Sequence, residues 1–123
     1  TGTANVLSMK SLEAALTAFE GVTIDQLRAK SVSLTSLFVD LFDGLLAPLG
    51  FTLGSPRDPD HRGSHVALGF ADGKRLVESM SVDGIIADFR PPDLMRFGFA
   101  PLYNTHSEVV SLAETLAARA TSR

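Results

Sequence analysis

The sequence of 123 residues has the size of one domain, and its 45% hydrophobic and 20% charged residues are typical of a folded protein. Its formal net charge of −3, without any run of basic residues, argues against nucleic acid as a partner, because phosphate binding requires clustered Lys and Arg. Cysteine is absent, which excludes disulfides and cysteine nucleophiles, and no apolar run reaches the roughly 20 residues of a membrane helix, so we expect no membrane partner.

The first predicted element is a short helix at residues 11–19, a stretch rich in Ala and Leu. Gly21 is expected to end it, because glycine readily adopts the left-handed conformation that follows many helices. The apolar residues that share one face of this helix are Leu12, Ala15, Leu16 and Phe19.

A second, longer helix is predicted to follow Thr23 and to run to about Ala47. Thr23 and Gln26 have the spacing of a capping box, in which each side chain accepts a hydrogen bond from a free backbone amide at the helix start. Pro48 and Gly50 are expected to close the helix. Its predicted apolar stripe consists of Leu27, Leu34, Phe38, Leu41 and Leu45.

The second half of the chain carries shorter elements. Residues 51–53 are a strand candidate, and residues 65–70 place apolar side chains at alternate positions, as a half-buried strand does. A short amphipathic helix is predicted around residues 76–80. Two further strands are predicted at residues 85–89 and 94–99, with prolines between them that force a break.

The last predicted element is a helix from Ser107 to about Arg119, which a second capping box of Thr105 and Glu108 precedes. Short strands that alternate with helices and are joined by tight turns indicate a small sheet covered on one side. We therefore predict an α+β fold, a two-layer sandwich in which a small, mostly antiparallel sheet is covered by helices.

The usual catalytic and metal-binding patterns are missing from the sequence. The histidines are His61, His65 and His106. The first two are four residues apart, a spacing that suits a metal ion only on a helix, and the residues between them are typical of a loop, so we predict no metal site. Ser64 lacks the second glycine of a Gly-x-Ser-x-Gly nucleophile turn. The chain therefore contains no convincing catalytic residue of its own.

Arg96 is unusual, because it lies between Met95 and Phe97 in a predicted apolar strand. A guanidinium group in such a place has to be solvated, paired or available for an anion. The residues alone leave three interpretations open: a salt bridge to Asp88 or Asp93, simple exposure to solvent, or a binding site for an anion.

Several stretches of the chain resemble the C-terminal region of bacterial kynureninases in residue order and spacing. The three longest are Arg62-Gly63-Ser64-His65-Val66, Gly84-Ile85-Ile86-Ala87-Asp88-Phe89-Arg90 and Met95-Arg96-Phe97-Gly98-Phe99-Ala100-Pro101-Leu102-Tyr103-Asn104. The similarity continues upstream at Thr1-Gly2-Thr3, Leu7-Ser8 and Leu27-Arg28-Ala29-Lys30-Ser31. It covers essentially the whole chain, and the stretch from Arg96 to Asn104 is its most specific part.

Kynureninases are fold-type I pyridoxal 5'-phosphate (PLP) enzymes of the aspartate-aminotransferase superfamily. The resemblance implies the C-terminal small domain of a cytoplasmic, homodimeric enzyme of tryptophan catabolism. Such an enzyme hydrolyses L-kynurenine, or 3-hydroxykynurenine, to L-alanine and anthranilate, or 3-hydroxyanthranilate. Residues 1–20 would then be a helical segment that joins or packs on a missing N-terminal PLP domain, and residues 21–123 would be the C-terminal α+β domain. The absence of an initiating Met agrees with a missing upstream part.

The resemblance also implies roles for two residues. Arg96 would bind the α-carboxylate of the substrate, because a bidentate guanidinium can hold a planar carboxylate and orient the amino acid over the cofactor. Thr3 would help to bind the PLP phosphate by reaching into the partner subunit's site. The two prolines that commonly follow that position in the family are replaced by Ala4-Asn5 here.

The catalytic lysine and the acidic partner of the pyridine nitrogen are expected in the missing domain, which would bind most of the PLP. The lysines of this chain are Lys10, Lys30 and Lys74. None of them lies in the sequence context of the family's catalytic lysine. We therefore expect the chain alone to be inactive.

Two other interpretations remain open on the sequence. The chain could be a stand-alone α+β module that binds a small-molecule carboxylate, or a domain of another fold-type I PLP enzyme, such as a cysteine desulfurase or an aminotransferase. A piece of a larger enzyme should expose apolar residues on its first helix, where an absent domain would pack. A stand-alone module should have no such patch.

Overall fold

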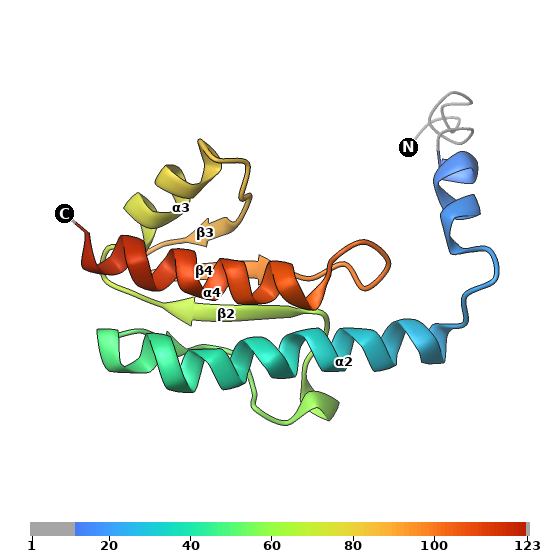
Figure 1. Cartoon of the computed structure of the whole chain (residues 1–123), viewed down its shortest axis with the longest axis horizontal. Helices are drawn as coiled ribbons and strands as arrows, with labels where there is room; N and C mark the ends of the chain where they lie inside the picture. The colour runs from blue at the N-terminus through green and yellow to red at the C-terminus, as the bar shows by residue number, and fades with distance from the viewer. Residues whose placement is uncertain (1–11, 123) are drawn as a thin grey trace, which may run out of the picture.

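Helices and strands form two layers in the structure (Figure 1). The computed structural model describes residues 12–122. Within this range a sheet of four strands has the order β1-β2-β4-β3, and each neighbouring pair is antiparallel. The strands are β1 (Thr52–Leu53), β2 (His65–Gly69), β3 (Asp88–Arg90) and β4 (Leu94–Gly98). The predicted α+β fold with a small antiparallel sheet is confirmed.

The long helix α2 (Ile24–Leu41) begins at the predicted capping box. The backbone amide of Gln26 donates to Thr23 Oγ1 at 3.1 Å, and the amide of Thr23 donates to Gln26 Oε1 at 2.9 Å. These two bonds satisfy amides that have no partner inside the helix, which fixes the residue at which the helix starts.

The C-terminal end of this helix corrects the predicted apolar stripe. A π-helical turn at Phe42–Leu46 follows α2, and a 3₁₀ turn at Ala47–Leu49 then ends at Gly50, whose φ of 98° is left-handed. Leu45 was expected to face inward but is 39% exposed, whereas the first and last residues of the π turn are buried. A π turn holds more residues than an α turn, so the inward face moves away from the positions that α-helical spacing predicts.

By length and composition alone, the continuous helical stretch Ile24–Leu49 could also cross a membrane. A core helix passes the same test, and this one is part of the hydrophobic core. Its side chains Leu34 and Phe38 are fully buried. Packing within the fold therefore accounts for part of the apolar character of the helix, since 33% of the candidate membrane window is buried.

The predicted strand at residues 85–89 is wrong in its position. Helix α3 (Gly73–Ser81) is followed by Gly84, whose φ of 81° is left-handed, and the amide of Ile85 donates to the carbonyl of Met80 at 3.1 Å. This bond belongs to the cap of the helix, so the chain cannot enter the sheet before β3. The strand begins at Asp88 and extends one residue beyond the predicted end, to Arg90.

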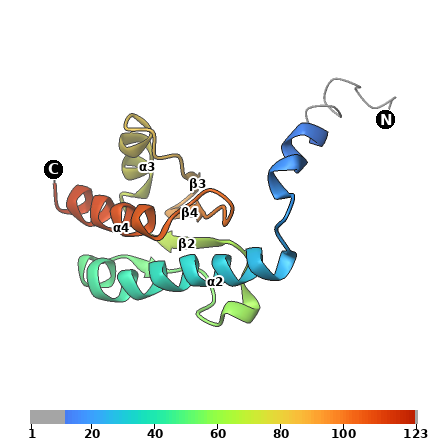
Figure 2. The same cartoon turned by 45° about the vertical axis from the view of Figure 1, so that its right-hand side comes forward.

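Helix α4 (His106–Thr121) starts at the second predicted capping box, in which Thr105 and Glu108 exchange side-chain-to-backbone hydrogen bonds of 3.2 and 2.9 Å. It lies beside α2, and the two helices cover one face of the sheet (Figures 1 and 2). The buried core between the two layers contains Leu34, Phe38, Val39, Phe42, Leu46, Phe51, Val66, Leu68, Leu76, Met80, Met95, Phe97, Phe99, Val109, Ala113 and Leu116.

Strand β2 is buried on both faces, although its alternating sequence predicted only one buried face. Val66 and Leu68 face the helices and are fully buried, as expected, but Ala67 on the opposite face is only 5% exposed. The chain after β1 lies beside this residue. The amide of Gly54 donates to the Ala67 carbonyl at 2.8 Å, and the Ala67 amide donates to Ser55 Oγ at 2.8 Å, so this loop continues along the edge of the strand at Ala67.

A buried arginine holds the same loop against α2. Arg62 is 9% exposed, and its guanidinium donates to Thr35 Oγ1 at 3.0 and 3.2 Å and to Ser36 Oγ at 2.9 Å. The other nitrogen donates to the carbonyls of Pro56 and Arg57 at 3.3 and 2.6 Å. Burial lowers the pKa of Arg62, and the nearby Arg28 acts in the same direction. All the bonds of this cation are made to neutral oxygens, so its role is to join the loop to the helix.

We expect Arg62→Ala to destabilise the chain by about 1–3 kcal/mol, because the substitution leaves partly buried oxygens without a donor. Urea unfolding followed by circular dichroism measures this change. Arg57→Ala is the matched control, because the Arg57 side chain is exposed and forms its ion pair with Asp43, at 2.8 Å. An equal loss of stability in the two variants would contradict the structural role of Arg62.

The helical residues 12–19 stand away from the sheet (Figure 2). Leu12, Leu16 and Phe19 are 60%, 55% and 40% exposed. Large apolar side chains that repeat along one helix face are usually covered by another surface. The expectation that the first helix exposes apolar residues is therefore confirmed, and a self-contained module would not be expected to show such a face.

Candidate functional site

Arg96 lies on the outer face of the sheet, opposite the helices. Side chains alternate along a strand, and its neighbours Met95 and Phe97 are buried in the core between the sheet and the helices. The Arg96 side chain is 37% exposed. The strand therefore holds the backbone of Arg96 firmly on both sides while its guanidinium group remains accessible to solvent.

Asp88 is the residue directly opposite Arg96 on the neighbouring strand β3. Arg96 Nε donates to Asp88 Oδ2 at 3.0 Å, and Arg96 Nη2 donates to the same oxygen. Arg90 lies two residues along β3 on the same face, and its Nε donates to Asp88 Oδ2 at 3.1 Å. Of the three interpretations of Arg96 that the sequence left open, the structure shows the salt bridge to Asp88, together with partial exposure.

The charges of this cluster do not cancel. Two guanidinium groups share one carboxylate, which leaves a net charge of +1 on Asp88, Arg90 and Arg96. The hydrogen bond from Arg96 is the largest cause that lowers the pKa of Asp88 below 3.8, followed by the hydrogen bond from Arg90. The carboxylate therefore stays ionised at pH values where an ordinary aspartate already takes up a proton, and the ion pair is lost only as the pH falls through this lowered pKa. The arrangement can attract a second, mobile anion.

The histidines are not gathered into one site. His61 Nδ1 lies 3.3 Å from a carboxylate oxygen of Asp58, and His106 Nε2 lies 2.7 Å from Ser33 Oγ. His65 is exposed at the start of β2. Within residues 12–122, no three His, Asp or Glu side chains are placed to hold a metal ion.

The other residues considered from the sequence can be placed only in part. Thr3 and Lys10 lie outside the described residues. Lys30 is half-buried on α2, and Lys74 is exposed in the first turn of α3. Neither of these lysines is bonded to Asp88, Arg90 or Arg96, and neither lines the cavity described next.

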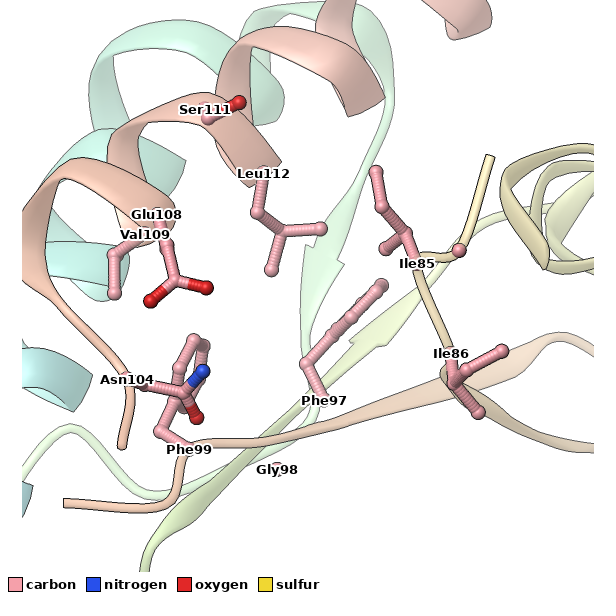
Figure 3. Close-up of a pocket in the computed structure, with 11 residues that line it drawn as sticks. Ile85, Ile86, Phe97, Gly98, Phe99, Asn104, Glu108, Val109, Ser111 and Leu112 are labelled. Atoms are coloured by element: carbon pink, nitrogen blue, oxygen red, sulfur yellow. The ribbon is translucent and has the colours of Figure 1, made fainter. Parts of the chain in front are cut away.

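A cavity of about 280 Å³ was not foreseen from the sequence. It lies on the helix side of β4, between that strand and α4, with Leu112 above Phe97 and Phe99 and with Ile85 and Ile86 along one side (Figure 3). Gly84 and Gly98 both contribute to its wall, and both have open space where a side chain would begin. A side chain at position 98 would point to the outer face of the sheet, as that of Arg96 does, so we identify no clear sequence signal of this cavity.

Two polar side chains in the wall of this cavity, those of Asn104 and Glu108, already have local partners. Glu108 Oε1 accepts from the amide of Thr105, and Asn104 Oδ1 accepts from the amide of Ala100 at 2.7 Å. The remaining wall is largely apolar, and no arginine or lysine contributes to it. The outer face of the sheet around Arg96 is therefore the better candidate for binding an anion.

Comparison with known proteins assigns the family. The sequence model of the kynureninase C-terminal domain matches residues 27–116. The chain belongs to the kynureninase C-terminal domain family. The matched region includes Asp88, Arg90 and Arg96, and it ends within α4. The helical residues 12–19, with their exposed apolar face, precede it.

Individual kynureninases agree with this assignment. The chain is 37% identical to a kynureninase of Pseudomonas fluorescens over 115 residues, which cover 94% of the chain and 28% of that relative. It is 40% identical to a kynureninase of Deinococcus radiodurans over 108 residues, which cover 88% of the chain and 26% of that relative. The chain thus spans about a quarter of the length of the curated kynureninases it matches.

Proposed function

We propose that this chain is the C-terminal domain of a PLP-dependent kynureninase that hydrolyses L-kynurenine, or 3-hydroxykynurenine, to L-alanine and anthranilate, or 3-hydroxyanthranilate. Family membership supports this proposal, and so does the position of Arg96. The observation that carries it is an accessible arginine, inside the matched region, in a cluster of net positive charge. Such a group is suited to the carboxylate that every amino-acid substrate carries.

In this function Arg96 binds the α-carboxylate of the substrate. A guanidinium offers parallel N–H groups that match the two oxygens of a carboxylate, so it fixes both the position and the rotation of the substrate. The sheet limits the movement of Arg96, because Met95 and Phe97 on either side of it are locked in the core. The domain then orients the substrate, while the bond-breaking groups belong to another part of the enzyme.

The residues described here fit a substrate-orienting role better than a cofactor-binding one. The cavity beside α4 is largely apolar and has no lysine in its wall. When bound elsewhere in the enzyme, PLP would supply an electron-poor ring that stabilises a carbanion. Thr3 is proposed to contact its phosphate in the partner subunit of a homodimer, and the enzyme is proposed to act in the cytoplasm in tryptophan catabolism.

The direct test of this proposal is an assay of the two-domain enzyme in which this domain follows its large domain. With PLP and L-kynurenine, the fluorescence of anthranilate should increase with time, and L-alanine should form in equal amount. The same assay with 3-hydroxykynurenine determines which substrate is preferred. Failure to form either aromatic product, in an enzyme that is folded and has PLP bound, would refute the proposed reaction.

The 123-residue chain by itself is expected to form no defined adduct with PLP. The two lysines that the structure describes are not enclosed in a pocket as a reactive lysine is, since Lys74 is exposed and Lys30 is only half-buried. Absorbance spectra, followed by borohydride reduction and peptide mass analysis, should show at most scattered modification. Stoichiometric labelling of one lysine would contradict a division in which the reactive lysine lies in the large domain.

A further inference from the structure

The hydrogen bonds of Arg96 show which part of its guanidinium remains available. A guanidinium has a side edge, formed by Nε and Nη2, and an end edge, formed by Nη1 and Nη2. Asp88 Oδ2 accepts from both nitrogens of the side edge. No hydrogen bond in the described part of the chain involves Nη1 of Arg96. The end edge therefore remains open to a ligand.

We propose that Asp88 is a positioning residue, which holds the side edge of Arg96 so that the substrate carboxylate is bound by the end edge. The inference rests on the proposed function and deepens it, because it adds a residue and a binding geometry to the same site. Asp88 itself does not touch the substrate. Its effect is exerted through the orientation of the arginine.

The register of the sheet makes Asp88 suitable for this role. It is paired directly with Arg96 across two antiparallel strands, so both side chains leave the sheet on the same face and at the same level. An arginine side chain is long and has many rotamers, and a partner fixed by the backbone reduces that freedom before the substrate arrives. The bound carboxylate then meets an arginine whose orientation has already been set.

Arg90 compensates for the cost of placing a negative charge beside a carboxylate site. Asp88 alone would neutralise Arg96 and would repel the substrate carboxylate. Because Arg90 donates to the same Asp88 oxygen, the cluster keeps a net positive charge. The three side chains can therefore orient Arg96 without removing its attraction for an anion.

The test is Asp88→Asn in the two-domain enzyme, with the steady-state constants for L-kynurenine as the readout. The amide has the same shape as the carboxylate but accepts hydrogen bonds less strongly and carries no charge. We expect KM to rise about fivefold to tenfold while kcat changes less than about twofold, because the lost contact acts on binding and not on bond breaking. If Asp88 only competed with the substrate for Arg96, its removal would lower KM, and that result would overturn the proposal.

Two controls separate positioning from a general loss of structure. Asp43→Asn removes a similar exposed ion pair, the one with Arg57, and should leave KM unchanged. A competitive inhibitor that has the kynurenine side chain but no α-carboxylate should bind the Asp88→Asn and wild-type enzymes equally well. Weaker binding of that inhibitor by the variant would show a wider disturbance of the site and would also overturn the proposal.

The proposal can fail independently of the proposed function. An Asp88→Asn enzyme with an unchanged KM would still be a kynureninase, but one in which Arg96 needs no fixed partner. In the chain alone, nitrogen NMR should show slow solvent exchange of the Arg96 Nε–H group, and Asp88→Asn should make that exchange faster. Equal exchange rates of the Arg96 Nε–H group in the wild-type and Asp88→Asn chains would show that Asp88 does not hold the side edge of Arg96, whatever reaction the enzyme performs.

Discussion

Arg96→Lys in the two-domain enzyme is expected to lower kcat/KM for L-kynurenine at least about tenfold. Lysine keeps the positive charge but has no planar pair of N–H groups, so it cannot hold both carboxylate oxygens in one orientation. A hydrogen bond to a charged group contributes about 1.5–3 kcal/mol, and about 1.4 kcal/mol corresponds to a factor of ten. The loss of one such bond is therefore sufficient for the expected effect.

The two kinetic constants show how Arg96 acts. A rise in KM alone would mean that Arg96 holds the substrate equally in the ground and transition states, and a fall in kcat would mean that it also aligns the reacting groups. Arg57→Lys is the matched control, because Arg57 is also paired with an aspartate but lies on the loop after β1. Unchanged kinetics in Arg96→Lys would remove Arg96 from carboxylate binding.

Phe38→Ala is expected to destabilise the domain by about 3–5 kcal/mol, the usual cost of removing a buried phenylalanine. Phe38 is fully buried on α2, and its ring lies 5.7 Å from that of Phe97 and 5.3 Å from that of Phe99. The substitution would leave a cavity exactly where the long helix meets the strand that carries Arg96. Because a domain has a stability of about 5–15 kcal/mol, a large part of the total would be lost.

Urea unfolding of the chain measures this effect, with circular dichroism and the NMR signals of the phenylalanine rings as probes. Ile24→Ala is the matched control, because Ile24 lies on the same helix but is 77% exposed. That variant should change the free energy of unfolding by less than about 0.5 kcal/mol. A loss of less than about 1 kcal/mol in Phe38→Ala would mean that the contact between α2 and β4 contributes little to the fold.

The elements that the sequence predicted well are those fixed by short-range chemistry. Thr23 with Gln26, and Thr105 with Glu108, determine the starts of α2 and α4 through bonds between residues three apart. Strand β4, which contains Arg96, was also predicted, because apolar residues at alternate positions require one buried face. These local patterns were sufficient to predict the α+β fold class.

Two kinds of feature were missed, local irregularities of the helix ends and features that depend on distant contacts. Leu45 was assigned to the core because a π turn cannot be recognised from α-helical spacing, and the start of β3 was misplaced because the cap of α3 retains Ile85. The burial of Ala67 on the outer face of β2 and the loop that Arg62 joins to α2 were not expected either. Asp88 was only one of two possible partners for Arg96, and the strand register decided between them.

The two outermost strands of the sheet are very short, with two residues in β1 and three in β3. Unpaired edges attract strands of other chains and so promote aggregation, and short edges that carry charge resist this. The β3 edge is short and carries the charges of Asp88 and Arg90, the two features that disfavour intermolecular strand pairing. Substitutions that neutralise Asp88 or Arg90 are therefore expected to lower the solubility of the protein as well as to change substrate binding. Such variants should be compared with the wild type at low protein concentration.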